Sequence, residues 1–249
     1  MIILQNEKLK KRIKKYVLII SAIIIIFILA ILMLKYEVEG EKKENLPFKL
    51  SSLAVAHVVD ATKNKDTKNL WNLNLMLVND IYLKIEKNPN KEDVIKSIKI
   101  TNMNITKMSE KGDIKITTIQ KDEEGLNIYT TDDMREFLFN GEQKTDLEKL
   151  TISNQGGTIG FRCMLENLTK YVSNEDEINY NGELLQKAKI TQEQVQMELS
   201  FELFMELESG IIYTGDVQIP LPMGTMLEHD NIITELSQEE LEKIIFKRI

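Results

Sequence analysis

The chain begins with one long apolar run. Residues 17–34 are eighteen consecutive uncharged positions, and Ser21 is the only polar side chain among them. As a helix rising about 1.5 Å per residue, this run extends roughly 27 Å, which is enough to cross the hydrocarbon core of a bilayer. Backbone groups inside lipid must pair within the segment, so a single span is expected to be helical. The pattern predicts a transmembrane helix over residues 16–34.

The flanks of this run predict its orientation. One acid, Glu7, accompanies six bases on its N-terminal side. Short basic flanks stay in the cytoplasm, so we expect the N-terminus inside and residues 35–249 outside. The alternative is a cleaved secretory signal, which usually has a shorter apolar region followed by small residues. Leu34 is followed by Lys35, Tyr36 and Glu37, so an uncleaved signal-anchor is favoured. The six bases are Lys8, Lys10, Lys11, Arg12, Lys14 and Lys15.

From Pro47 onward the apolar positions follow period two, which is typical of half-buried strands with one wet face. Asn79 and Asp80 separate two such stretches, and turn signals separate others. The spacing predicts a mainly β ectodomain, an antiparallel sandwich of the immunoglobulin-like kind. The expected strands cover residues 48–59, 71–77, 81–86, 95–105, 114–119 and 158–164.

The clearest alternation lies in residues 195–207, where every odd position is apolar and Phe204 is the only apolar even one. Only a strand sorts these residues onto two faces. Ser209 and Gly210 turn the chain, and 211–221 continue the pattern, with Gly215 as a possible bulge. We predict a long antiparallel hairpin over 195–221, a closing strand in 242–249, and helical turns near 183–189, 191–194 and 237–240.

These elements suggest five consecutive regions. They are a cytoplasmic basic segment (1–15), the transmembrane helix (16–34), a charged flexible stalk (35–46), a first β-domain (47–145) and a second β-domain (146–249). The boundary near 145 rests on a charged stretch that is poor in apolar residues.

Charge and cysteine content narrow the function classes. The chain carries a formal net charge of −7, of which the first 34 residues contribute +5, so the remainder carries −12. An acidic ectodomain repels nucleic acid, so no nucleic-acid partner is expected. The single cysteine, Cys163, excludes an internal disulfide. Abundant Ile, Lys, Asn and Glu suggest an AT-rich bacterial genome and a bacterial cell envelope.

Candidate catalytic residues are few. The chain has two histidines, His57 and His229. His57 lies in an apolar strand and is expected to be structural. Cys163 could form a thiol dyad with either histidine, but no local motif supports this, so a buried inert thiol is favoured. We therefore assign no catalytic residue.

Candidate binding motifs are also weak. Glu177, Asn179, Asn181 and Gly182 resemble the first half of a calcium loop, but position twelve is Ala188 where a bidentate Glu is needed. A solvated loop is favoured there. Residues 155–157 could bind an anion through backbone donors, although a tight turn between strands is favoured. We expect no metal and no cofactor.

Several segments together resemble a known group of proteins. The basic N-terminus, single span and charged stalk are followed by NLPFKLSSLAV, NDIYLKIEKN, SNQGGTIGFR, YVSNEDEI and a closing IIFKRI. This order is similar to that of membrane-anchored envelope proteins of Gram-positive, clostridia-type bacteria. The resemblance implies an envelope location and a β ectodomain, and it implies no activity and no site residue.

Three functions remain open from the sequence. The first is a non-catalytic, membrane-tethered envelope protein that contacts the bilayer through residues 16–34 and binds a protein or cell-wall component. The second is an envelope hydrolase with a carboxylate pair, for which a cleft with carboxylates roughly 5–10 Å apart would be diagnostic. The third is an accessory subunit of a membrane complex. The first is the expectation we carry forward.

Overall fold

The computed structural model describes the backbone of residues 2–64, 70–119, 128–130, 137–139, 142–144, 149–225 and 232–249. Side chains are described for residues 13–63, 70–119, 154–225 and 232–249. The chain divides into two compact units, Met1–Lys42 and Lys43–Ile249.

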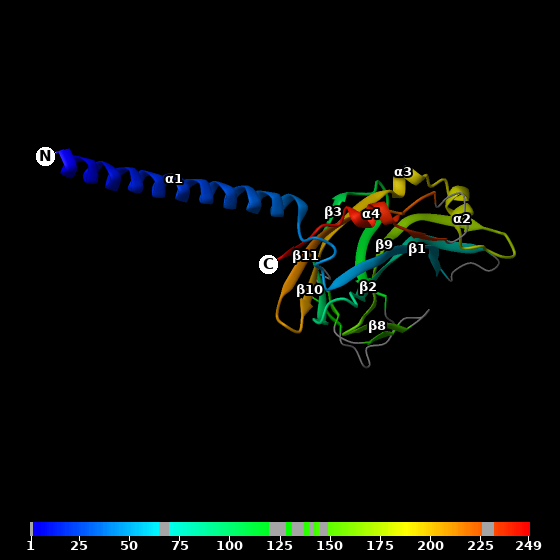
Figure 1. Cartoon of the computed structure of the whole chain (residues 1–249). Helices are drawn as coiled ribbons and strands as arrows, with labels where there is room; N and C mark the ends of the chain where they lie inside the picture. Colours follow the sequence, from blue (N-terminus) through cyan, green and yellow to red (C-terminus); the bar gives the residue numbers. More distant parts are fainter. Residues whose placement is uncertain are drawn as a thin grey trace. The chain divides into compact units, whose positions relative to one another are not determined.

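The first unit is one helix, α1 (Ile2–Glu39), seen as the long blue coil in Figure 1. Its stretch Ile13–Glu39 is long and apolar enough to cross a membrane. The helix ends at Gly40, whose φ of 66° lies in the left-handed region and whose N–H donates to the carbonyl of Tyr36 at 2.7 Å. Glycine is favoured at such a helix end because it has no Cβ.

The predicted stalk over 35–46 is wrong at both ends. At its start, α1 continues to Glu39, since no glycine or proline interrupts it and Lys35 and Glu39 approach within 3.5 Å one turn apart. At its end, Leu46 is buried in the core of the second unit, and its carbonyl accepts a hydrogen bond from the Asn88 amide at 2.9 Å. The stretch outside both elements is therefore much shorter than predicted.

The second unit contains two antiparallel sheets. Sheet 1 has the strand order β12-β1-β2-β9-β8-β7, and β4 also pairs with β9. Its three long central strands lie side by side, as Figure 1 shows. Its strands are β1 (Phe48–Asn64), β2 (Trp71–Lys87), β4 (Asp113–Thr118), β7 (Glu142–Lys144), β8 (Lys149–Ser153), β9 (Gly156–Ser173) and β12 (Ile232–Glu235).

Sheet 2 has the order β13-β11-β10-β3-β6-β5. Its strands are β3 (Ile95–Lys107), β5 (Ile128–Thr130), β6 (Phe137–Phe139), β10 (Met197–Leu207), β11 (Ile212–Leu221) and β13 (Phe246–Arg248). Three short helices connect the strands: α2 (Gly182–Lys187), α3 (Gln192–Val195) and α4 (Gln238–Glu242). Capping boxes begin α3 at Thr191 and α4 at Ser237, as the sequence predicts.

The two sheets pack against each other through apolar side chains. Phe161 of β9 meets Phe201 of β10 edge to face, with ring centroids 5.5 Å apart. Phe48 of β1 contacts Tyr213 of β11 and Phe246 of β13 in the same way. Such aromatic pairs add about 0.5–1.5 kcal/mol beyond the area they bury. The prediction of a mainly β chain with a sandwich of antiparallel sheets is confirmed, whereas the immunoglobulin-like form stays a prediction.

The predicted division into β-domains 47–145 and 146–249 is not found. Lys43–Ile249 forms one compact unit, and both sheets combine strands from the two ranges. In sheet 1, β2 pairs with β9, and in sheet 2, β3 pairs with β10. The charged stretch around residue 145 carries β7 and the start of β8, so it separates strands and not domains.

The hairpin predicted over 195–221 is confirmed in its register from Met197 onward, whereas Val195 ends α3 and does not belong to the strand. The odd residues of β10 are buried and the even ones are half-buried, without a break along the strand. The expected bulge at Gly215 is wrong, because Gly215 pairs regularly with Leu203. A Cβ at Gly215 would lie 2.8 Å from the ring of Phe246, so glycine is needed for that ring to pack on β11.

We predict that two phenylalanines on one strand differ sharply in their contribution to stability. Phe201→Ala should lower the free energy of unfolding by about 3–5 kcal/mol, because it leaves a cavity between the sheets. Phe204→Ala, on the outer face of the same strand, should cost about 1 kcal/mol or less. Urea denaturation of both variants measures the difference, and equal losses would contradict the assigned faces of β10.

Candidate functional site

His57 lies fully buried on β1, within a row of hydrogen bonds that crosses sheet 1. Its Nε2 accepts from the backbone N–H of Met223 at 3.0 Å, which fixes the proton on Nδ1. Nδ1 is 2.7 Å from the Asn79 side-chain oxygen and donates to it. The Asn79 amide then donates to the carbonyl of Cys163 on β9 at 3.1 Å. All hydrogen bonds of this row can form only when His57 is neutral, because a protonated Nε2 could not accept from Met223.

Burial lowers the pKa of His57 below its ordinary value of 6.5, because desolvation disfavours the imidazolium. The hydrogen bonds to Asn79 and Met223 act in the opposite direction and are outweighed. Both ring nitrogens are occupied, so His57 cannot serve as the base of a dyad with Cys163. His57 is buried and hydrogen-bonded at both ring nitrogens, as expected for a structural histidine, and Cys163 is a buried thiol. His229 lies outside the described residues.

Asp80, next to Asn79 on β2, points to the other face of sheet 1. Its two carboxylate oxygens accept from Nε and NH2 of Arg162 at 2.6 and 2.8 Å. Asp80 is 3% exposed, so this two-point contact compensates a buried charge. The expected break in the strand at Asn79 and Asp80 is therefore wrong, and β2 runs through as one 17-residue strand. The solvent-exposed face predicted for β2 is also wrong at Asp80, which is buried on that face.

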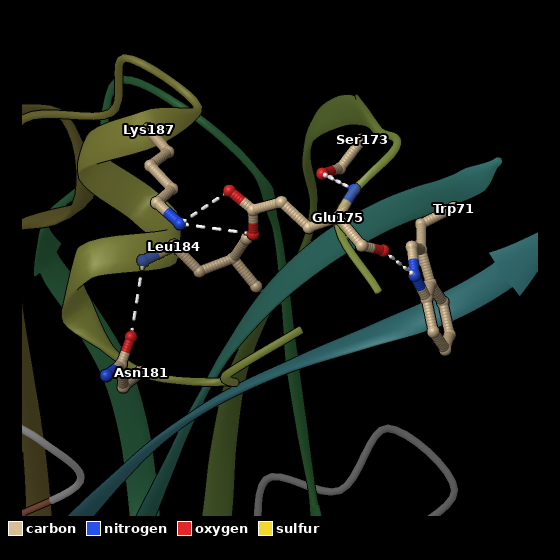
Figure 2. A network of polar contacts seen from close by, with 6 residues as sticks. All are labelled: Trp71, Ser173, Glu175, Asn181, Leu184 and Lys187. Carbon is tan, nitrogen blue, oxygen red and sulfur yellow. Dashed lines mark hydrogen bonds and ion pairs between the residues drawn. The ribbon is translucent and has the colours of Figure 1, made fainter. Parts of the chain in front are cut away.

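The calcium-loop-like segment has a structural role. Figure 2 shows Asn181 at the start of α2, where its side-chain oxygen accepts the N–H of Leu184 at 3.4 Å. Gly182 opens α2 and Ala188 closes it, so both of these positions belong to helix ends. No group of three or more His, Cys, Asp or Glu arranged to hold a metal occurs in the part of the chain that the structure describes.

Glu175 holds the same loop onto sheet 1. Its carboxylate accepts from Lys187 Nζ at 2.8 and 3.1 Å, and its N–H donates to the Ser173 hydroxyl at 3.1 Å (Figure 2). Its carbonyl accepts from the indole nitrogen of Trp71 at 2.8 Å. The Lys63 ammonium lies 3.7 Å from the centre of that indole ring. These contacts attach the acidic loop and α2 to sheet 1.

The tight turn that the sequence favoured at 155–157 lies at Asn154 and Gln155, and Gly156 and Gly157 begin β9. Gly156 has a φ of 102°, and a Cβ there would lie 2.2 Å from the carbonyl oxygen of Ile85. Ser153 pairs with Gly156, and the carbonyl of Gln155 accepts the N–H of Lys87. The glycine is thus required by the close approach of β2 and the β8–β9 turn.

A groove on the outer face of sheet 2 is the main candidate site. It has a volume of about 760 Å³ and runs along β10 and β11 beside the segment that contains α4. A hollow of this size falls in the range of small-molecule and peptide sites. It is lined by Asn102, Thr106, Ser200, Phe201, Glu202, Asp216, Val217, Gln218, Pro220, Leu236, Glu240, Lys243 and Ile244.

Two carboxylates face each other across the floor of this groove. Glu202 and Asp216 are directly opposite partners of β10 and β11. Side chains in such positions have Cβ atoms about 4.5–5.5 Å apart, and like charges there oppose strand pairing. Glu202 accepts a hydrogen bond from the Asn102 amide at 2.6 Å, and Asn102 itself has a φ of 52° at an irregularity of β3. No cation pairs with Glu202 or Asp216 among the described residues.

The neighbouring Glu198 is compensated differently. Its carboxylate accepts hydrogen bonds from the Thr106 hydroxyl at 2.7 Å and from the Gln218 amide. These contacts, Thr106 first, hold the pKa of Glu198 below its ordinary value. Lys243, on the opposite wall, lies 3.6 Å from Glu239. The groove therefore presents a local excess of negative charge at Glu202 and Asp216.

The sequence did not single out the groove residues. Glu202 appears in it as one of several wet-face acids of a strand, and Asp216 as one polar position of the next. Glu202 and Asp216 lie opposite each other because of the hairpin register. That register can be derived from the sequence by pairing residues outward from the turn at Ser209 and Gly210. The wall of the groove depends on the path of residues 236–244, which no local pattern indicates.

We predict a pH dependence of stability that originates at His57. Below its unfolded pKa near 6.5, the unfolded chain binds a proton that the folded chain does not, so stability is complete above 6.5 and falls on acidification. The loss is at most about 1.4 kcal/mol per pH unit. Thermal unfolding between pH 7.5 and 5.5 measures it.

Variants separate the two histidines in this experiment. The slope should persist in His229→Gln and flatten in His57→Gln, whatever the absolute stability of each variant. In His229→Gln, nuclear magnetic resonance should place the His57 titration below pH 6.5. A midpoint above 6.5 would contradict the neutral row.

Compared with known proteins, the chain matches no family model, no curated protein sequence and no solved structure.

Proposed function

We propose that this protein is a membrane-tethered cell-envelope protein with a cytoplasmic N-terminus, whose β ectodomain binds a protein or cell-wall component without catalysis. The observation that carries the proposal is the groove on the outer face of sheet 2, with the like-charged pair Glu202 and Asp216 on its floor.

The helix supports the membrane part of the proposal. Its side chains from residue 13 to residue 34 are exposed, as expected for a segment that contacts lipid. Tyr16 and Tyr36 stand near the two ends of the apolar stretch, about 30 Å apart along a helix. Tyrosine is enriched at both membrane interfaces, and the bases before Tyr16 favour a cytoplasmic N-terminus.

The groove supports binding. Asp216, Gln218 and Pro220 are exposed, so a partner reaches the groove without any rearrangement of the core. Like charges held face to face weaken strand pairing, and a positively charged partner group would relieve that repulsion. The groove is thus suited to a partner with basic groups.

An envelope hydrolase is the second candidate, because Glu202 and Asp216 place two carboxylates opposite each other in one groove, and glycosidases use such a pair. Two observations count against it. Asp216 is exposed and Glu202 half-buried, whereas a general acid usually needs an apolar setting. The only aromatic residue that lines the groove within the described chain, Phe201, is buried between the sheets and offers no platform for a sugar ring.

The orientation is testable by cysteine labelling. Cys163 is fully buried, so the native chain should give no signal with a membrane-impermeant maleimide. Gln218→Cys should be labelled in intact spheroplasts, and Asn6→Cys only after permeabilisation, on a chain of full length. Labelling of Asn6→Cys in intact spheroplasts, or its loss from the mature chain, would contradict an uncleaved anchor with a cytoplasmic N-terminus.

The binding function is testable by photo-crosslinking in growing cells. A photoreactive phenylalanine analogue at Gln218 should yield an adduct of defined mass, and the same analogue at Lys84, exposed on sheet 1, should not. Asp216→Lys should abolish the adduct while keeping the fold, because it replaces a like-charge pair by an opposite-charge pair. Equal adducts at Gln218 and Lys84, or an adduct insensitive to Asp216→Lys, would speak against the groove.

A further inference from the structure

We infer that the groove receives an extended basic segment of a partner protein, which adds to the exposed edge of β11 as a further strand. This inference rests on the proposed function and specifies the chemistry of the partner. It follows from the edge of β11, from the direction of its backbone groups and from the charges beside it.

The edge of β11 is only partly covered. Strand β13 pairs with Tyr213, Thr214 and Gly215, and β11 continues to Leu221. The residues that precede Phe246 do not pair with β11. Of these, residues 236–244 line the far side of the groove. Along 216–220, no strand within the described residues lies on this side of β11. The groove extends from the outer face of β10 and β11 past this edge to residues 236–244.

The backbone groups that point into this space follow from strand parity. Ile211 gives its carbonyl to Leu207 of β10, whereas Ile212 gives its carbonyl to Ile249 beyond β13. In an antiparallel ladder such groups alternate along the strand, so even residues face the outer edge. The N–H groups of Asp216 and Gln218 therefore point into the groove, as do the carbonyls of Asp216, Gln218 and Pro220.

Pro220 agrees with this direction. Proline has no N–H and occurs in strands where its nitrogen faces an unpaired edge. Its place on β11 thus marks the groove side as the edge. Exposed strand edges are templates for pairing with another chain, and proline and charge restrict which chain can pair. Strand addition to such an edge is a common mode of peptide recognition.

The charges and apolar residues define the partner's side chains. A residue opposite Asp216 has its side chain on the outer face, where a lysine or arginine would contact Asp216 and reach towards Glu202. Residues on either side of it in the added strand point inward, towards Leu236 and Ile244 of the opposite wall. The fitting segment therefore alternates basic and aliphatic residues over about six positions.

The test uses the full-length protein in phosphatidylcholine nanodiscs, whose surface carries no net charge. The probe is a fluorescein-labelled hexapeptide of alternating valine and lysine, and fluorescence anisotropy measures its binding. We expect saturable binding below millimolar concentration and slower amide exchange at Asp216 and Gln218. The same peptide with glutamate in place of lysine should bind at least about tenfold more weakly.

Backbone pairing is tested by a matched pair of variants. Gln218→Pro removes one groove-facing N–H and should weaken binding at least about tenfold, whereas Gln218→Ala, which keeps that N–H, should not. Of two peptides N-methylated on alternate amides, one should bind like the parent and the other should lose binding, because only every second amide faces β11. Unfolding curves of both variants check that the fold is intact.

Each other outcome overturns the inference in a distinct way. Binding that survives Gln218→Pro and both methylated peptides rejects strand addition and leaves the groove as a binding surface. Equal binding of the glutamate peptide rejects the basic partner. No binding at millimolar concentration rejects the inference, while an adduct at Gln218 in cells would still support the proposed function. A dimer abolished by Gln218→Pro would make a second copy of the chain the occupant.

Discussion

The structure of the unit Lys43–Ile249 depends on β2 running unbroken between β1 and β9. At its centre the strand carries two consecutive polar residues, Asn79 and Asp80, which point to opposite faces of sheet 1. Asn79 is accommodated on the core side by His57 and the Cys163 carbonyl, and Asp80 on the other side by Arg162. Each buried polar group left without its partner would cost about 1–3 kcal/mol or more. Satisfied on both faces, these residues fix the register of three long strands.

The remainder of the sandwich is organised around this sheet. Met223, which follows β11 of sheet 2, donates to His57 and so connects the hairpin of one sheet to the buried row of the other. The C-terminal segment runs from β12 at the edge of sheet 1, through α4, to β13 at the edge of sheet 2. Phe246 ends that crossing by packing on Gly215, and this contact determines where β13 stops covering β11. The groove is a consequence of that crossing.

This arrangement separates the residues that stabilise the core from the groove that we propose as the binding site. The buried side chains of His57, Asn79 and Asp80 hold strands together through their hydrogen bonds. The groove uses exposed side chains and backbone groups at a strand edge, where substitutions change charge and pairing with little effect on the core. Under the proposed function, tethering of both partners to one membrane would raise their effective concentration at the groove.

The sequence by itself determined the elements whose signal is local. Uniform apolarity predicts α1, and the alternation of 195–207 predicts both β10 and its buried face, because periodicity is a property of consecutive residues. Only the tertiary structure decided that β2 pairs with β9 and β3 with β10, that Asn79 and Asp80 are buried within one strand, and that residues 236–244 form a wall opposite β11. Those outcomes depend on long-range burial and on hydrogen-bond partners distant in sequence, which no local pattern encodes. The predicted domain boundary and stalk were wrong for the same reason, since charge along the chain does not reveal which segments bury each other.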